Sequence, residues 1–139
     1  MVPPCHVAAA TCHGVLPRGP VGCDDERVQP YTGSDFYCDV ALRDTAALDV
    51  VHEDERVLAY HHTRPFWDVH LVVVPKRHIS SLTTATAADA EDLRALLVVV
   101  QQVARTVEER YGAACVETNL GAYQDSKHLH VHVHCGDVR

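Results

Sequence analysis

The sequence has 139 residues, of which 47% are hydrophobic and 22% are charged. This composition is typical of one globular domain and excludes an intrinsically disordered chain. The formal net charge of −7 has the wrong sign for a protein that binds phosphate backbones, so we expect no nucleic-acid partner. The longest apolar run, residues 96–100, is far too short to span a bilayer, and we expect no membrane association.

The cysteines and the N-terminal residues predict a reduced, cytoplasmic protein. None of the six cysteines is spaced as C-x-x-C, the pattern of zinc ribbons and redox dithiols. The first ten residues lack a basic region followed by a long apolar run, so we expect no signal peptide. Residues 1–33 are rich in proline and glycine and predict an irregular arm. The Cys-His pairs of this arm, at 5–6 and 12–13, have no convincing partner at metal-ligand spacing.

Regular patterning begins near residue 36 and predicts an α+β domain over residues 34–139. Apolar residues recur at helical spacing between 93 and 107, with Thr86 as a plausible N-cap and Gly112 as the stop. Short runs rich in β-branched residues and bounded by turns predict strands. The expected elements are, in chain order, a strand or short helix at 36–42, a strand beginning at 50–51, strands at 56–61 and 69–75, a helix at 86–111, and strands at 116–120 and 129–135.

Four histidines alternate with apolar residues near the C-terminus. On a strand, this spacing places His128, His130, His132 and His134 on one face and the apolar residues on the other. Neighbouring imidazoles could then divide phosphate chemistry between them, one attacking phosphorus while the next binds its oxygens. The same spacing is compatible with a catalytic zinc site. A purely structural row is the weakest interpretation, because buried imidazoles need partners and repel each other when charged.

The segment H-L-H-V-H-V-H at 128–134 resembles His-φ-His-φ-His-φ-φ, the signature of the histidine triad (HIT) superfamily, where φ is apolar. A second segment, H-L-V-V-V-P-K-R-H at 70–78, resembles the H-x-L-V-I-P-K-x-H segment of that family. Residues 58–61 resemble the strand that reaches the nucleotide sugar, and 36–42 resemble the first strand region. The resemblance covers about residues 35–137 in the expected order.

The resemblance implies a HIT-like fold, with a five-stranded antiparallel sheet, one long helix and a short helix, and with the sheet extended across a homodimer. It also implies a nucleotide hydrolase or nucleotidyltransferase that attacks the α-phosphate of a nucleoside monophosphate derivative through a nucleotidyl-histidine intermediate. The small-molecule substrate would be of the phosphoramidate or dinucleoside-polyphosphate type. No cofactor is required for this reaction.

The family pattern assigns roles residue by residue. His130, the middle histidine, would be the nucleophile, and His132 would bind the phosphoryl oxygens. His128 and His70 would support this network. The substrate-binding candidates are Phe36, Tyr37 and Val40 for the base, His61 and His62 at the sugar, Asn119 and Gln124 at polar positions before the triad, and Ser126, with Gln124, for the phosphate or leaving group.

Several residues depart from the family pattern and leave the substrate open. His62 stands where the family often has an aspartate that binds the ribose hydroxyls. Asp125 replaces a serine or threonine and brings negative charge towards the phosphate site. His134 replaces the last apolar position of the signature. The loop from Asn119 to the triad is also shorter than usual.

Some branches of the family hold structural zinc with C-x-x-C and two histidines that match His70 and His128. In this sequence Asp35 stands at the position of the first cysteine, and Cys38 stands at the position of the second. Because carboxylate is an acceptable zinc ligand, Asp35, Cys38, His70 and His128 could form a tetrahedral set. Two other classes therefore compete with the enzyme: a metal-dependent protein that uses the same histidines, and a nucleotide-binding module with little turnover.

Overall fold

The computed structural model describes residues 31–139, and residues 33–139 form one compact unit. Residues 1–30 lie outside the described part, and with them nearly all of the arm predicted at 1–33, including both Cys-His pairs. Within the described residues, no helix is long and apolar enough to cross a membrane. The helices are α1 (Phe36–Asp39) and α2 (Ala90–Tyr111), and the strands are β1 (Val50–Glu53), β2 (Val57–His61), β3 (Trp67–Pro75), β4 (Cys115–Glu117) and β5 (Val131–Val138).

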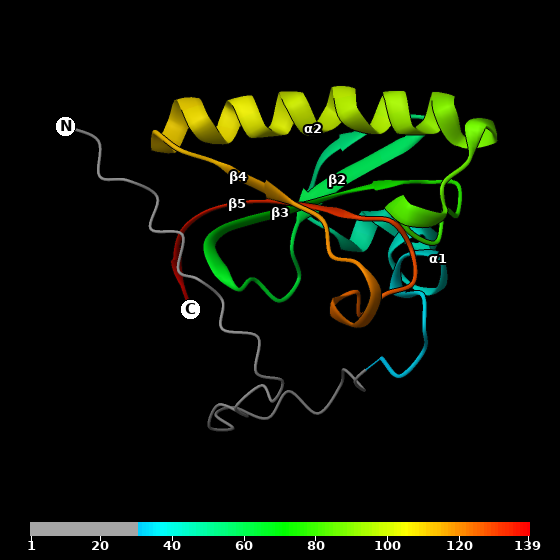
Figure 1. The fold of residues 1–139 in the computed structure, drawn as a ribbon. Helices are drawn as coiled ribbons and strands as arrows, with labels where there is room; N and C mark the ends of the chain where they lie inside the picture. The colour runs from blue at the N-terminus through cyan, green and yellow to red at the C-terminus, as the bar shows by residue number, and fades with distance from the viewer. Residues whose placement is uncertain (1–30) are drawn as a thin grey trace. The chain divides into compact units, whose positions relative to one another are not determined.

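The five strands form one antiparallel sheet in the order β1-β2-β3-β5-β4 (Figure 1). One long helix, α2, and one short helix, α1, accompany the sheet. The predicted α+β class and sheet are therefore confirmed, whereas the extension of the sheet across a dimer stays a prediction. Residues 36–42 form the short helix and a 3-10 turn, not a strand, because Asp35 caps the helix by accepting a hydrogen bond from the Cys38 N–H.

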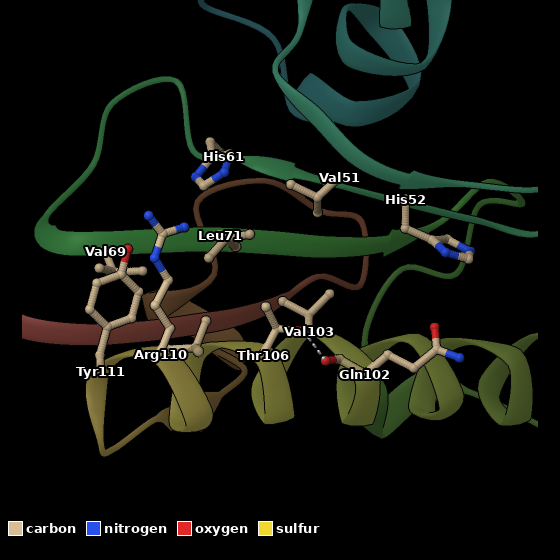
Figure 2. A pocket seen from close by; sticks show the side chains of 11 residues that line it. Val51, His52, His61, Val69, Leu71, Gln102, Val103, Thr106, Arg110 and Tyr111 are labelled. Atoms are coloured by element: carbon tan, nitrogen blue, oxygen red, sulfur yellow. Dashed lines mark hydrogen bonds between the residues drawn. The ribbon is translucent and has the colours of Figure 1, made fainter.

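The sheet is covered on both faces, so β2 is buried up to its last residue, as are the adjoining parts of β3 and β5. Helix α2 packs on one face, where its side chains meet alternate residues of the strands, including Val57, Ala59, Leu71, Val73, Val131 and Val133. The opposite face, with Leu58, Tyr60, Val72 and Val74, packs against Tyr37 of α1. A cavity of about 290 Å³ remains between α2 and the first three strands (Figure 2).

Helix α2 ends where its sequence predicts, whereas its first predicted turn differs. Thr86 and Asp89 form a capping box, in which the Asp89 carboxylate accepts a hydrogen bond from the Thr86 N–H at 2.8 Å. The first predicted turn is a 3-10 segment, Ala87–Asp89, and the α-helix continues from Ala90. Gly112 ends the helix with φ +84°, a left-handed conformation that glycine adopts at little cost.

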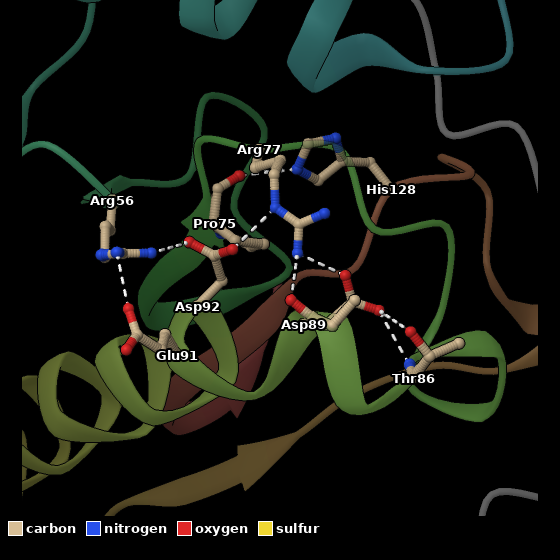
Figure 3. A network of polar contacts seen from close by, with 9 residues as sticks. Arg56, Pro75, Arg77, Thr86, Asp89, Glu91, Asp92 and His128 are labelled. Atoms are coloured by element: carbon tan, nitrogen blue, oxygen red, sulfur yellow. Dashed lines mark hydrogen bonds and ion pairs between the residues drawn. The ribbon is translucent and has the colours of Figure 1, made fainter.

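A buried carboxylate joins the start of α2 to the sheet. Asp92 accepts hydrogen bonds from Arg56 at 2.9 Å and from Arg77 at 2.7 Å (Figure 3). These two arginines, which flank β2 and β3, hold the pKa of the Asp92 carboxyl below its ordinary value. The network therefore fixes where the helix lies over the strands.

The last strand begins later than predicted. The sequence pattern predicts a strand at 129–135, whereas β5 begins at Val131 and extends to Val138. The Leu129 N–H donates to the carbonyl of Ile79, outside the sheet, at 2.6 Å. His128 and His130 consequently precede the regular ladder, although their side chains are still buried.

Candidate active site

The central strands bring the predicted catalytic histidines together. In the antiparallel register, His70 of β3 lies opposite His134 of β5, and Val72 lies opposite His132. The ring centroid of His132 lies 5.0 Å from those of both His70 and His130. All four imidazoles are buried, on the sheet face that packs against α1 and not the face under α2.

Hydrogen bonds fix the tautomers of His70 and His132. The Phe66 N–H donates to His70 Nδ1 at 3.1 Å, so the neutral His70 ring carries its proton on Nε2. This Nε2–H donates to His132 Nδ1 at 2.9 Å. His132 in turn must carry its proton on Nε2. It therefore presents an N–H donor, the group that a phosphoryl oxygen needs.

The tautomer of His130 is the one that a nucleophile requires. Its Nδ1–H donates to the backbone carbonyl of His128 at 2.7 Å, which leaves the lone pair on Nε2. The ring of Tyr37 lies 4.9 Å from the His130 ring and covers it on the α1 side. His130 thus carries an Nε2 lone pair, and the neighbouring His132 carries an Nε2–H donor.

Burial keeps these imidazoles uncharged at neutral pH. It lowers the pKa of His130 below 6.5, although the hydrogen bond to the His128 carbonyl and the charge of Asp125 oppose it. Burial, together with the neighbouring histidines, lowers the pKa of both His132 and His70 to about 3. A neutral imidazole can attack phosphorus, whereas a protonated one has no lone pair to offer.

His128 belongs to a second cluster. Its Nε2–H donates to the Pro75 carbonyl at 2.8 Å (Figure 3), so its Nδ1 lone pair faces Asp35 and Cys38 at 3.3 and 3.4 Å. His78 Nδ1 lies 2.7 Å from the same carboxylate of Asp35. The four ligand atoms lie within 4.8 Å of one another. Two imidazoles, a thiol and a carboxylate form a donor set that fits tetrahedral zinc.

The predicted zinc set was wrong in one member. His70 cannot join it because His70 is committed to Phe66 and His132, and the fourth group is His78, three residues after the end of β3. Burial and the neighbouring Asp35 raise the pKa of the Cys38 thiol to about 11. The thiol is therefore protonated until a cation displaces the proton.

Two of the polar candidates are engaged in backbone contacts that shape the loop before the triad. The Gln124 side chain is buried and donates to the Ser80 carbonyl at 2.7 Å. Ser126 Oγ accepts a hydrogen bond from the Phe36 N–H at 2.9 Å, which ties the loop to α1. Asn119 is half-buried just after β4.

The three base-pocket candidates differ in burial. Tyr37 is buried against the triad, as its contact with His130 shows, and Phe36 is half-buried with its ring 5.7 Å from that of Tyr37. Val40 is exposed at the end of α1. Of the three, only Tyr37 reaches the histidines directly.

The two sugar candidates point to opposite faces of the sheet. His62 stacks on His70 with ring centroids 4.2 Å apart, and its ring lies 5.9 Å from that of His132. His61 lies opposite Leu71 in the ladder and lines the cavity under α2 (Figure 2). His61 also borders a hollow beside His62 and His70, so its place at the sugar stays a prediction.

The comparisons with known proteins agree with this geometry. Residues 44–137 match the family described as HIT domain. An uncharacterised HIT-like protein of Synechococcus elongatus is 33% identical over 94 residues, which cover 66% of this chain and 82% of that protein. A HIT family hydrolase from Legionella pneumophila has a TM-score of 0.65 at 25% identity, covering 74% of this chain and 93% of that one. A histidine triad protein from Clostridium difficile has a TM-score of 0.64 at 27% identity, with 79% and 96% covered.

The family match spans more than half of the sequence and contains both histidine segments. The sheet order, the long helix and the alternating triad fit the same assignment. The chain therefore belongs to the HIT domain family.

Proposed function

We propose that the chain is a nucleotide hydrolase or nucleotidyltransferase that forms a nucleotidyl-histidine on His130. The observation that carries the proposal is the combination of two tautomers on neighbouring residues. His130 keeps a lone pair on its buried Nε2, and His132 carries a hydrogen-bond donor on its own Nε2. The likeness to a structure named as a HIT family hydrolase supports it.

The proposed reaction has two displacements at phosphorus. His130 Nε2 forms a bond to the α-phosphorus, and the bond to the leaving group breaks, with its electron pair going to that group, which takes up a proton. The His132 N–H donates to a non-bridging oxygen, where negative charge grows in the transition state. Water or another acceptor then attacks phosphorus and loses a proton, and the P–N bond electrons return to His130.

Asp125 brings negative charge towards the proposed site, and its carboxylate opposes the lowering of the His130 pKa by burial. Nucleoside phosphoramidates and dinucleoside polyphosphates both present an α-phosphate to His130, so both substrate types belong to the proposal.

Trapping of the intermediate tests the nucleophile. We expect adenosine phosphoramidate labelled in the phosphate to leave an acid-labile label on the wild-type protein after rapid quenching. His130→Ala should carry no label and lose turnover by several orders of magnitude, while His52→Ala, in β1, keeps both. Turnover by His130→Ala near the wild-type rate would exclude the mechanism. Nucleotide binding without label or turnover in the wild type would favour a binding module instead.

We also propose that Asp35, Cys38, His78 and His128 hold a structural zinc ion. The support is the orientation of His128. The lone pair on its Nδ1 faces a carboxylate and a thiol, neither of which is a strong hydrogen-bond donor. A cation among them would satisfy all four groups and tie α1 to the end of β3. His78→Ala should lower zinc affinity at this site by at least about tenfold, as judged by competition with a chromophoric chelator. Unchanged affinity would exclude these ligands.

A homodimer is the assembly that we propose. Leu97 and Val98 of α2 are 66% and 48% exposed, and Val116 on the edge strand β4 is 47% exposed. Burial of such apolar surface against a second copy would lower the free energy, and pairing of two β4 edges would satisfy their outward backbone groups. This arrangement would extend the sheet across the dimer.

A further inference from the structure

A third group of metal-binding side chains lies at the β4 edge of the sheet. Cys115 of β4 is directly opposite His134 of β5, and Glu117 follows two residues later on the same face. One ligand atom from each of the three residues lies within 4.8 Å of the others. This group shares no residue with the proposed zinc site or with the pair His130 and His132.

The His134 side chain is buried and aimed at this group. The residue is 8% exposed, and its Nε2 atom is the buried side-chain nitrogen or oxygen that lacks a hydrogen-bond partner within the described residues. Glu117 Oε1 lies 3.6 Å from this nitrogen, which is within ion-pair distance of a protonated imidazole but beyond hydrogen-bond distance. A buried nitrogen without a hydrogen bond destabilises the fold, so a cation bound to the Nε2 lone pair would remove that penalty.

Trp67 holds the His134 ring in this orientation. The two rings stack with centroids 3.6 Å apart and planes 11° apart. The imidazole therefore needs little reorganisation to use Nε2 as a ligand, whereas Cys115 and Glu117 reach it from the more accessible neighbouring strand.

We propose that Cys115, Glu117 and His134 bind a divalent zinc-class cation at the β4 edge. A thiolate, a carboxylate and an imidazole are zinc ligands, and the thiol and imidazole disfavour magnesium and calcium, which prefer oxygen. Three protein ligands leave a fourth coordination position for water or an exogenous ligand. Binding would release the Cys115 thiol proton and satisfy His134 Nε2.

Trp67 gives the test a local reporter, because it is the single tryptophan of the chain and contacts a proposed ligand. The full-length protein, reduced and stripped of metal, is titrated with Co²⁺ while tryptophan fluorescence is recorded. We expect saturable quenching, because Co²⁺ on His134 Nε2 would lie close to the indole. Zn²⁺, which does not quench in this way, should reverse it by competition.

The variants separate this site from other metal sites. Cys115→Ala, a change at an exposed position, should weaken the Co²⁺ quenching by at least about tenfold, and His134→Val should do the same. Cys135→Ala removes a thiol on the opposite face of β5, and Cys38→Ala removes one ligand of the proposed structural zinc site. Both variants should keep the wild-type midpoint of the Co²⁺ titration. An unchanged midpoint in Cys115→Ala would overturn the proposal and place the ion on other residues. Absence of saturable quenching in the wild type would also overturn it.

Discussion

Acid should destabilise this protein through its buried histidines, His70 and His132. Burial lowers the pKa of each from 6.5 to about 3. Between these two values the unfolded chain binds more protons than the folded chain, so the free energy of unfolding rises with pH. The contribution of the neutral imidazoles is fully present above pH 6.5 and is lost as the pH falls towards 3.

The size of the effect follows from the same two values. Lowering the pH from 7 to 5 protonates an unfolded imidazole almost fully but leaves the folded one neutral. This difference lowers the free energy of unfolding by about 2 kcal/mol for each histidine and by about 4 kcal/mol for both. Since a domain of this kind is stable by about 5–15 kcal/mol, the loss is a large share of the total.

Urea unfolding at pH 7 and at pH 5, followed by circular dichroism, measures this effect. His70→Gln and His132→Gln should each reduce the loss between the two pH values by about 2 kcal/mol, even where the variant is less stable at pH 7. The matched control is His61→Gln, whose exposed side chain lies on the other face and should leave the loss unchanged. Equal losses in the wild type and in both cluster variants would refute the reasoning.

Three further predictions concern the helix, the sugar and the assembly. Asp92→Asn should lower the free energy of unfolding, measured by urea titration, by about 1–2 kcal/mol, because its charge-assisted hydrogen bonds to two half-exposed arginines are lost. An unchanged free energy of unfolding would contradict a stabilising role for this network. His62→Asp should raise the affinity for AMP about tenfold, as measured by calorimetric titration, because a carboxylate accepts hydrogen bonds from both ribose hydroxyls. An unchanged affinity would place the sugar elsewhere. Leu97→Glu should halve the molecular mass measured by light scattering, whereas Leu82→Glu, at another exposed position, should leave the mass unchanged. A monomeric wild-type protein would contradict the dimer.

The fold and the core of the site could be predicted because both depend on local periodicity. Alternation of polar and apolar residues sets the face of each histidine on β5, and the helical period sets the buried stripe of α2. His70 could be placed because it begins a buried run whose proline marks the end of the strand. These signals operate over a few residues and survive changes in the rest of the chain.

The errors arise where periodicity stops or where partners are distant in sequence. His78 follows the end of β3, and its approach to Asp35 depends on how the loop after Pro75 meets the segment before α1. His61 ends β2 opposite Leu71, whereas His62 follows the strand and stacks on His70, so the two side chains have different surroundings. The strand predicted at 69–75 begins after Trp67, whose stacking on His134 requires the register between β3 and β5.

The alternating segment supplies three different chemical groups because each imidazole has a different partner. His128 donates a hydrogen bond from Nε2 to the Pro75 carbonyl and leaves the Nδ1 lone pair free of that bond, whereas His130 donates from Nδ1 to the His128 carbonyl and keeps its lone pair on Nε2. His132 Nδ1 accepts a hydrogen bond from the His70 Nε2–H, so His132 carries its own proton on Nε2. The sequence period determines which face an imidazole occupies, but the partner of its second nitrogen determines whether it acts as a ligand, a nucleophile or a donor. Removal of a partner should therefore change the chemistry of a histidine that is itself unaltered.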